Sequence, residues 1–115
     1  MLTEKINELK HRIIEYATLV ETMIHKSIKG LLEKDEQLLH EVIEREEPRA
    51  NAYDRELDET CTALIAQFEP VAKDLRTVVM ILNMNQDLER VADHAVNISE
   101  SSLFLIARPS LAVVN

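Results

Sequence analysis

Turn-forming residues are scarce in this chain, which has one glycine and three prolines among its 115 residues. Tight β-hairpins rely on glycine and similar residues at their turns, so a sheet built from many short strands is excluded. Aromatic residues make up only 3% of the chain, so leucine, isoleucine, valine and alanine must fill the core. The expected fold class is therefore all-α, in a single domain.

Cysteine and long apolar runs are also nearly absent. The single cysteine, Cys61, cannot form a disulfide within the chain, and its helical surroundings predict a small buried side chain. No window approaches the roughly 18 apolar residues of a membrane-spanning helix, and the charged N-terminal stretch is unlike a signal peptide. We therefore expect a cytoplasmic location.

Positive charge is in deficit, because 21 acidic residues outnumber 13 lysines and arginines and leave a net charge of −8. A chain of this charge repels phosphate backbones and anionic lipid surfaces, so nucleic-acid binding is not expected. Metal cations and basic protein surfaces are better matched as partners.

Apolar residues recur at three- and four-residue steps along almost the whole chain, and this period predicts three long helices. The first covers about 2–33 and ends soon after Gly30. The second covers about 35–68 and is stopped by Pro70, and the third covers about 73–107. Helices of this length joined by short links predict an antiparallel three-helix bundle.

Pro48 conflicts with the helix in which it is predicted to lie. A proline inside a helix removes one hydrogen bond and crowds the carbonyl of the residue four positions earlier, here Glu44, at a cost of about 3 kcal/mol. Either the helix kinks at Pro48, or a short helix over 36–46 is followed by a separate one with Pro48 in its first turn. We predict the kink.

The domain is expected to cover 1–107, and 108–115 to form a tail or the start of a missing second repeat. This tail is apolar and carries no charge after Arg108, which is typical of a lead into a segment supplied elsewhere. Three long rods also make a thin bundle with much exposed side surface. We therefore expect a second bundle to pack beside the first, as in a homodimer.

One face of the third predicted helix changes from apolar to polar along its length. Residues on this face, spaced by three and four, are Leu75, Val79, Leu82, Gln86, Glu89, Asp93, Asn97 and Glu100. The second helix changes in the same way when it is read away from Pro70. Its corresponding residues are Ile65, Cys61, Asp58, Asp54, Asn51 and Glu47.

A hairpin centred on Pro70 would bring these two faces together, with residue numbers at one level adding to about 140. In this register Ile65 faces Leu75 and Cys61 faces Val79. Farther out, the register predicts three polar pairs, which are Asp54 with Gln86, Asn51 with Glu89, and Glu47 with Asp93.

Carboxylates that converge without lysine or arginine repel one another, and a bound cation would relieve that repulsion. Oxygen donors suit hard or borderline cations such as Mg²⁺, Ca²⁺, Mn²⁺ or iron. The expected cofactor is a divalent or transition metal ion, with iron, manganese, magnesium and zinc as candidates. The candidate ligands are Glu47, Asn51, Asp54, Glu89 and Asp93. The alternative is a solvated acidic face that binds no metal.

Other histidines and acids offer little for catalysis. Glu8 and His11 form a single Glu-x-x-His, whereas a di-iron bundle needs two, so a surface pair is expected. His94 lies beside the polar face and is expected to face solvent. No nucleophile with a base and no glycine-rich phosphate loop is found in the sequence, so an enzyme is not expected. Two alternatives remain, a structural dimerisation module with an acidic partner-binding stripe and an oxygen-activating di-metal enzyme.

Two strings, EPVAKDLR at 69–76 and DLERVADHAVNI at 87–98, carry a more specific signal. They resemble the strings QPVAxDLR and DLERIGDHAxNI of the PhoU family of bacterial phosphate-signalling proteins. The resemblance extends over residues 1 to about 107. It implies one three-helix repeat of the two that family members generally carry.

The resemblance implies a non-enzymatic adaptor that negatively regulates the phosphate-starvation response. Its partners would be the ATPase of a Pst-type phosphate transporter and a membrane sensor kinase, and it would reach the membrane only through them. The family's metal clusters use paired Glu/Asp-x-x-x-Asp motifs. In this chain those motifs fall on Glu89 with Asp93, and on Glu47 with Asn51.

This chain departs from the family pattern at several positions. Asn51 stands where the family usually has aspartate, and Asp54 or Glu46 could supply the missing carboxylate. The remaining departures are Pro48, Glu69 and Ala92.

Overall fold

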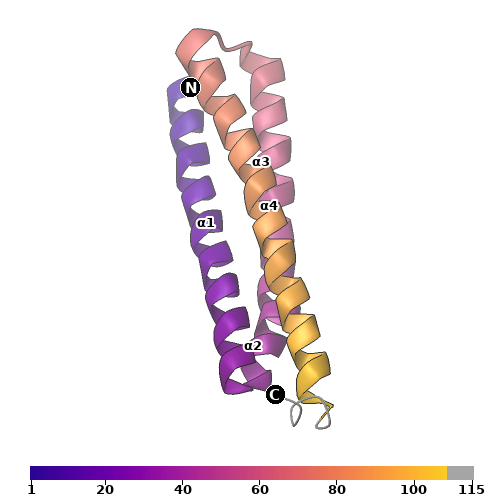
Figure 1. Ribbon diagram of the computed structural model, residues 1–115. Helices are drawn as coiled ribbons and strands as arrows, with labels where there is room; N and C mark the ends of the chain where they lie inside the picture. The colour runs from indigo at the N-terminus through magenta and orange to yellow at the C-terminus, as the bar shows by residue number, and fades with distance from the viewer. Residues whose placement is uncertain (109–115) are drawn as a thin grey trace.

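The computed structural model describes residues 1–108, and within this range it contains helices and no strands. In chain order these are α1 (Leu2–Glu33), α2 (Glu36–Glu41), a π-helical turn η1 (Val42–Glu46), α3 (Glu47–Phe68) and α4 (Ala72–Ile106). Together α2, η1 and α3 form the second arm of a three-arm bundle measuring 59 × 20 × 16 Å (Figure 1). The predicted all-α three-helix bundle is confirmed. Residues 109–115 of the predicted tail lie outside the described residues.

The three arms run down, up and down, so that α1 and α4 point the same way and the N-terminus and the end of α4 lie at opposite ends (Figure 1). The first and third arms are long, with 32 residues in α1 and 35 in α4. Within residues 1–108, neither these nor the other helices are both long and apolar enough to cross a membrane.

The first link is made by capping at residues 34 and 35. Lys34 adopts the left-handed conformation (φ 54°), and its N–H donates to the carbonyls of Gly30 and Leu31, which ends α1. The Asp35 side chain then accepts a hydrogen bond of 3.3 Å from the N–H of Leu38 and so caps α2, as an N-cap aspartate should.

Gly30 lies inside α1 and has a packing role there. A Cβ placed on it would lie 2.6 Å from Leu39 Cδ2, and Leu39 is fully buried. The missing side chain of Gly30 therefore lets α2 fold back closely onto α1.

Pro48 lies in the first turn of α3, where its missing N–H leaves no bond unmade within that helix. The turn before it is π-helical, since the N–H of Glu47 donates to the carbonyl of Val42, five residues back. The alternative, a short helical stretch over 36–46 followed by a helix with Pro48 in its first turn, therefore describes this arm better than one α-helix with Pro48 inside it. The wider π-turn places the irregular hydrogen bonding just ahead of the proline, and helical backbone continues from 36 to 68.

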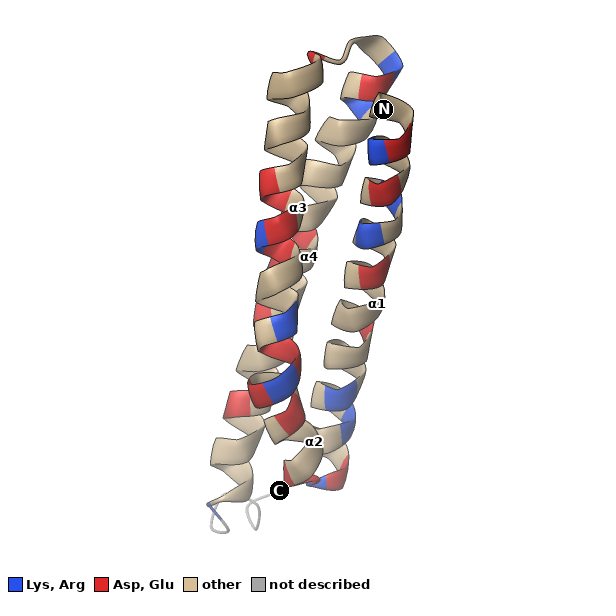
Figure 2. Ribbon diagram, turned by 180° about the vertical axis from the view of Figure 1, so that it is seen from behind, with Lys and Arg blue, Asp and Glu red and all other residues tan. Residues whose placement is uncertain are grey.

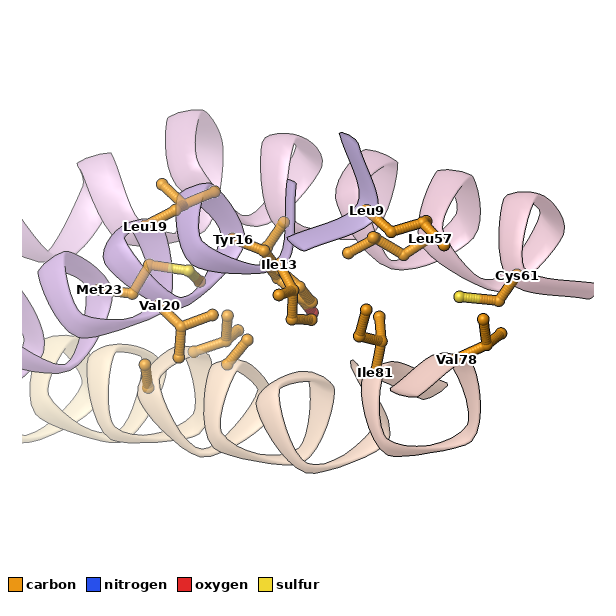
Figure 3. Close-up of a cluster of buried hydrophobic side chains, with 14 of the residues drawn as sticks. Leu9, Ile13, Tyr16, Leu19, Val20, Met23, Leu57, Cys61, Val78 and Ile81 are labelled. Atoms are coloured by element: carbon orange, nitrogen blue, oxygen red, sulfur yellow. The ribbon is translucent and has the colours of Figure 1, made fainter. Parts of the chain in front are cut away.

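The core is a row of apolar side chains contributed by all three arms (Figure 3). Full burial of one large apolar side chain contributes about 1.5–3 kcal/mol. The buried members labelled in Figure 3 are Leu9, Ile13, Tyr16, Leu19, Val20, Met23, Leu57, Cys61, Val78 and Ile81.

The face of α4 that enters the core is not the face that the sequence pattern selected. Leu75 and Val79, which the register placed opposite Ile65 and Cys61, are 37% and 41% exposed, while Val78 and Ile81 are buried. Steps of three and four residues fit two adjacent faces of this helix almost equally well. The polar stripe predicted on α4 therefore flanks the core instead of entering it.

Cys61 is fully buried in α3, as predicted. Burial, together with the nearby charge of Asp58, raises the pKa of the thiol to about 11. The thiol is therefore neutral at physiological pH and acts as a small apolar group.

Candidate metal centre between the second and third arms

Asp93 on α4 is the centre of the acidic site. Its negative charge raises the pKa values of Glu47 and Asp54 on α3 and of Glu89 one turn away on α4. These four carboxylates come from the predicted set of five ligands. The fifth, Asn51, lies exposed on α3.

The causes of the pKa shifts differ between the two arms. Glu89 has a raised pKa mainly because of the charge of Asp93, and its burial contributes less. The pKa of Glu47 is raised first by burial and then by the charges of Glu100 and Asp93. Repulsion within the site therefore acts both along α4 and across the gap between α3 and α4.

Asp54 is held by a hydrogen-bonded partner that the sequence analysis did not select. The Nδ2 of Asn85 donates to Asp54 Oδ1 at 2.9 Å and to the main-chain oxygen of Asp54 at 3.1 Å. The pKa of Asp54 is raised by burial, lowered by this hydrogen bond, and raised again by the charges of Asp58 and Asp93. The pairing lies one residue from the predicted partner Gln86, so the predicted register is nearly correct.

Tyr16 supplies the inner wall of the site from α1. Its side chain is 1% exposed, and its ring stacks on Tyr53 with 5.7 Å between centroids. Its pKa is raised by burial first and then by the charges of Asp54, Glu89 and Asp93. In the sequence Tyr16 appeared only as one member of an apolar period, so its position beside the acids was not predicted.

A separate ion-pair cluster lies at η1. The Lys26 Nζ lies 2.8 Å from Glu41 Oε1 and 2.7 Å from Glu46 Oε1. Both hydrogen bonds raise the pKa of Lys26, and the one to Glu41 has the larger effect. Glu46 is only 2% exposed, and its Oε2 has no hydrogen-bond partner. Because Lys26 binds Glu46, Glu46 does not replace the missing carboxylate at position 51.

Acidic residues follow one another on α3 and α4 through the middle and lower part of the bundle (Figure 2). A groove of about 830 Å³ lies elsewhere, between α1 and α3, and no predicted ligand lines it. His94 is exposed, as predicted. Glu8 and His11 are also exposed, and His11 Nδ1 lies 2.8 Å from the Asn7 carbonyl oxygen.

The chemistry of these donors fits a hard cation, although the side chains are not closed around one. Among residues 1–108, no three or more histidine, cysteine, aspartate or glutamate side chains are grouped as a ready metal site. Carboxylates from two arms nevertheless repel one another, and the buried Oδ1 of Asn85 has no partner. A cation between the arms would relieve both features.

The fold and the site define a small all-helical module with an acidic face shared by two arms. The PhoU domain model matches residues 13–102, and the chain belongs to the PhoU family. No solved structure gives a significant match to the chain.

Three similar relatives are each named a phosphate-specific transport system accessory protein PhoU homolog. The Aquifex aeolicus protein is 32% identical over 96% of this chain and 49% of its own length. Homolog 1 of Thermotoga maritima is 33% identical over 84% of this chain and 41% of its own. The Deinococcus radiodurans protein is 36% identical over 80% of this chain and 43% of its own length.

This chain therefore spans about half the length of the curated relatives that it matches. The family is one of regulatory accessory proteins, so an oxygen-activating di-metal enzyme is set aside.

Proposed function

We propose that this protein is a cytoplasmic regulator of phosphate uptake that represses the phosphate-starvation response. It would act as an adaptor between the ATPase of a Pst-type phosphate transporter and a membrane sensor kinase. Membership of the PhoU family and the names of the relatives support the link to phosphate transport. The kinase is proposed from the resemblance of the two sequence strings to those of the family.

The adaptor would carry a metal ion between α3 and α4. Glu47, Asp54, Glu89 and Asp93 would supply carboxylates, and Asn51 would supply an amide oxygen. The observation that carries this proposal is that one carboxylate, Asp93, affects acids on both arms. A divalent or transition metal ion, among iron, manganese, magnesium and zinc, would cancel the repulsion and stabilise the contact between the arms.

Replacing Asp93 by alanine is expected to abolish metal retention, because Asp93 is the carboxylate common to both arms. Elemental analysis of protein purified without chelator measures the metal content of the wild type and of Asp93→Ala. Asp87→Ala is a matched control, since Asp87 is 74% exposed on the same helix and its nearest cation is Arg90 at 3.8 Å. Equal metal content in Asp93→Ala and the wild type would remove the assigned site.

A second copy of the chain would cover a row of exposed apolar residues on α4. Met84, Val91 and Leu105 are 40%, 39% and 45% exposed, and Ile98 between them is partly buried. Consecutive residues in this row are seven positions apart. This spacing keeps the side chains on one face of the helix and is typical of helix-to-helix contacts. Relatives of about twice this length support the proposal that a second bundle belongs beside this one.

The protein is expected to be a dimer in solution at micromolar concentration, and Val91→Glu is expected to be a monomer. The substitution would place a charge in the middle of the apolar row, where it would be desolvated in the dimer. Light scattering coupled to size exclusion measures both masses. Asn83→Glu, at an exposed position of the same helix, should remain dimeric. A monomeric wild type would contradict the homodimer.

The alternative function is a structural dimerisation module whose acidic stripe contacts a basic partner. The lack of a closed group of three ligands in residues 1–108 favours this alternative. A ligand that binds only the folded state raises the melting temperature. An unaltered Tm with millimolar Mn²⁺, Mg²⁺ or Fe²⁺ would therefore support the module over the metal-binding adaptor.

A further inference from the structure

Asn85 is a buried polar side chain at the edge of the acidic site. It is 2% exposed, on the face of α4 that packs into the bundle, and it contacts Asp54 of α3. A buried amide is ordinarily satisfied at both its nitrogen and its oxygen. Here only the nitrogen is satisfied, because Asn85 Oδ1 has no hydrogen-bond partner.

The orientation of the Asn85 amide follows from its two partners. The main-chain oxygen and Oδ1 of Asp54 are both acceptors, so the amide must present its NH₂ group to them. Turning the amide over would place oxygen against oxygen. The carbonyl oxygen of Asn85 is therefore the free atom, and leaving it unpaired and away from water is unfavourable.

A cation bound to Asp54 lies within reach of this oxygen. The nitrogen and oxygen of one amide are about 2.2 Å apart by covalent geometry, and Asn85 Nδ2 is 2.9 Å from Asp54 Oδ1. The two oxygens are thus at most about 5 Å apart, a span that one Ca²⁺ ion with metal–oxygen distances of about 2.3–2.6 Å can bridge, and smaller ions need the oxygens closer together within that limit.

We propose that Asn85 is a further member of the cation site, where its NH₂ group orients Asp54 and its carbonyl oxygen is a neutral ligand for the ion. This inference rests on the cation site proposed above. It also narrows the class of metal, since amide oxygen beside carboxylates suits Mn²⁺, Mg²⁺ and Ca²⁺, whereas zinc sites are built mostly from nitrogen and sulfur.

A neutral residue at position 85 suits a site that must also fold without metal. An aspartate here would hold the same shape, but it would face Asp54 and add to the repulsion already present around Asp93. Asparagine keeps an oxygen available to the ion and donates to Asp54 when no ion is bound.

Titration with MnCl₂, by calorimetry and by thermal melting, tests this role on the wild type and four variants. Asn85→Leu, which has nearly the same size but no polar atoms, is expected to bind Mn²⁺ about ten-fold more weakly. Asn85→Asp is expected to melt below the wild type without metal, yet to gain more in Tm from Mn²⁺, because it adds an anionic ligand. Asn83→Leu and Asn83→Asp, at an exposed position on the same helix, should match the wild type in Mn²⁺ affinity.

The outcomes separate this inference from the metal site on which it rests. If Asn85→Leu binds Mn²⁺ with wild-type affinity, or if Mn²⁺ raises the Tm of Asn85→Asp no more than that of the wild type, then Asn85 only holds Asp54 in place and is not a ligand. If Asp93→Ala loses Mn²⁺ while both Asn85 variants retain it, the site stands and the role of Asn85 is overturned. If the wild type binds no Mn²⁺, the role of Asn85 as a ligand is overturned, and elemental analysis of the purified wild type decides separately whether the site holds another metal.

Discussion

Replacing Lys26 by methionine is expected to lower the free energy of unfolding by about 3 kcal/mol. Methionine preserves the apolar stem of Lys26 but removes its ammonium group, which donates a hydrogen bond of 2.7 Å to Glu46. Glu46 is 2% exposed, so its carboxylate would remain buried without a counter-ion. Urea denaturation at pH 7, followed by circular dichroism, measures the change.

Two further variants establish that the loss comes from the buried charge. Lys29→Met removes an exposed lysine of the same helix and should change stability by less than about 0.5 kcal/mol. Adding Glu46→Gln to Lys26→Met removes the unpaired charge and should recover at least half of the loss. A Lys26→Met protein as stable as Lys29→Met would show that the ion pair contributes nothing.

Gly30→Ala is expected to destabilise the protein by about 2 kcal/mol, although alanine is the better helix former. The new Cβ would lie 2.6 Å from Cδ2 and 2.7 Å from Cγ of Leu39, which is fully buried and cannot move aside freely. The clash therefore outweighs the gain of about 1 kcal/mol in helix propensity. The same denaturation experiment measures the difference.

The effect of Gly30→Ala should reverse when Leu39 is also replaced by alanine. With the leucine side chain gone, the added methyl group has room, and the propensity gain should appear as a stabilisation relative to Leu39→Ala alone. Destabilisation of similar size in both backgrounds would mean that the close approach of α2 to α1 does not require glycine.

The helices could be predicted from the sequence because their apolar periods are long and regular. The first and third arms begin and end within a residue or so of the predicted limits, and the second is helical from 36 to 68. The π-turn could not be predicted, since one residue more in a turn leaves the spacing of apolar side chains nearly unchanged. The sequence signalled a problem only through Pro48.

The position of the acidic site could be predicted in outline, because one face of each of the two arms changes from apolar to polar at about the same distance from Pro70. Asp93 does act on Glu47 across the two arms, as the register predicted. Tyr16 was missed because it lies on the face of α1 assigned to the core, and Asn85 was missed because it lies beside the stripe that the sequence selected on α4. A polar atom at the edge of a core is recognised only once the neighbouring arm is in place.

The Lys26 and Glu46 pair was missed for a different reason. The two residues are 20 positions apart, and a glutamate within a run of charged residues normally faces water. Burial of Glu46 depends on how the π-turn rotates the chain against α1, which local spacing does not reveal.

The π-turn η1 also bears on how this chain is aligned with its relatives. A five-residue hydrogen bond encloses one residue more than the usual α-helical bond, so the second arm holds a surplus residue between 42 and 46. A homologue whose second arm is regular α-helix can therefore be superposed only by opening a single-residue gap inside a helix. At this position such an indel reflects backbone geometry and not an alignment error.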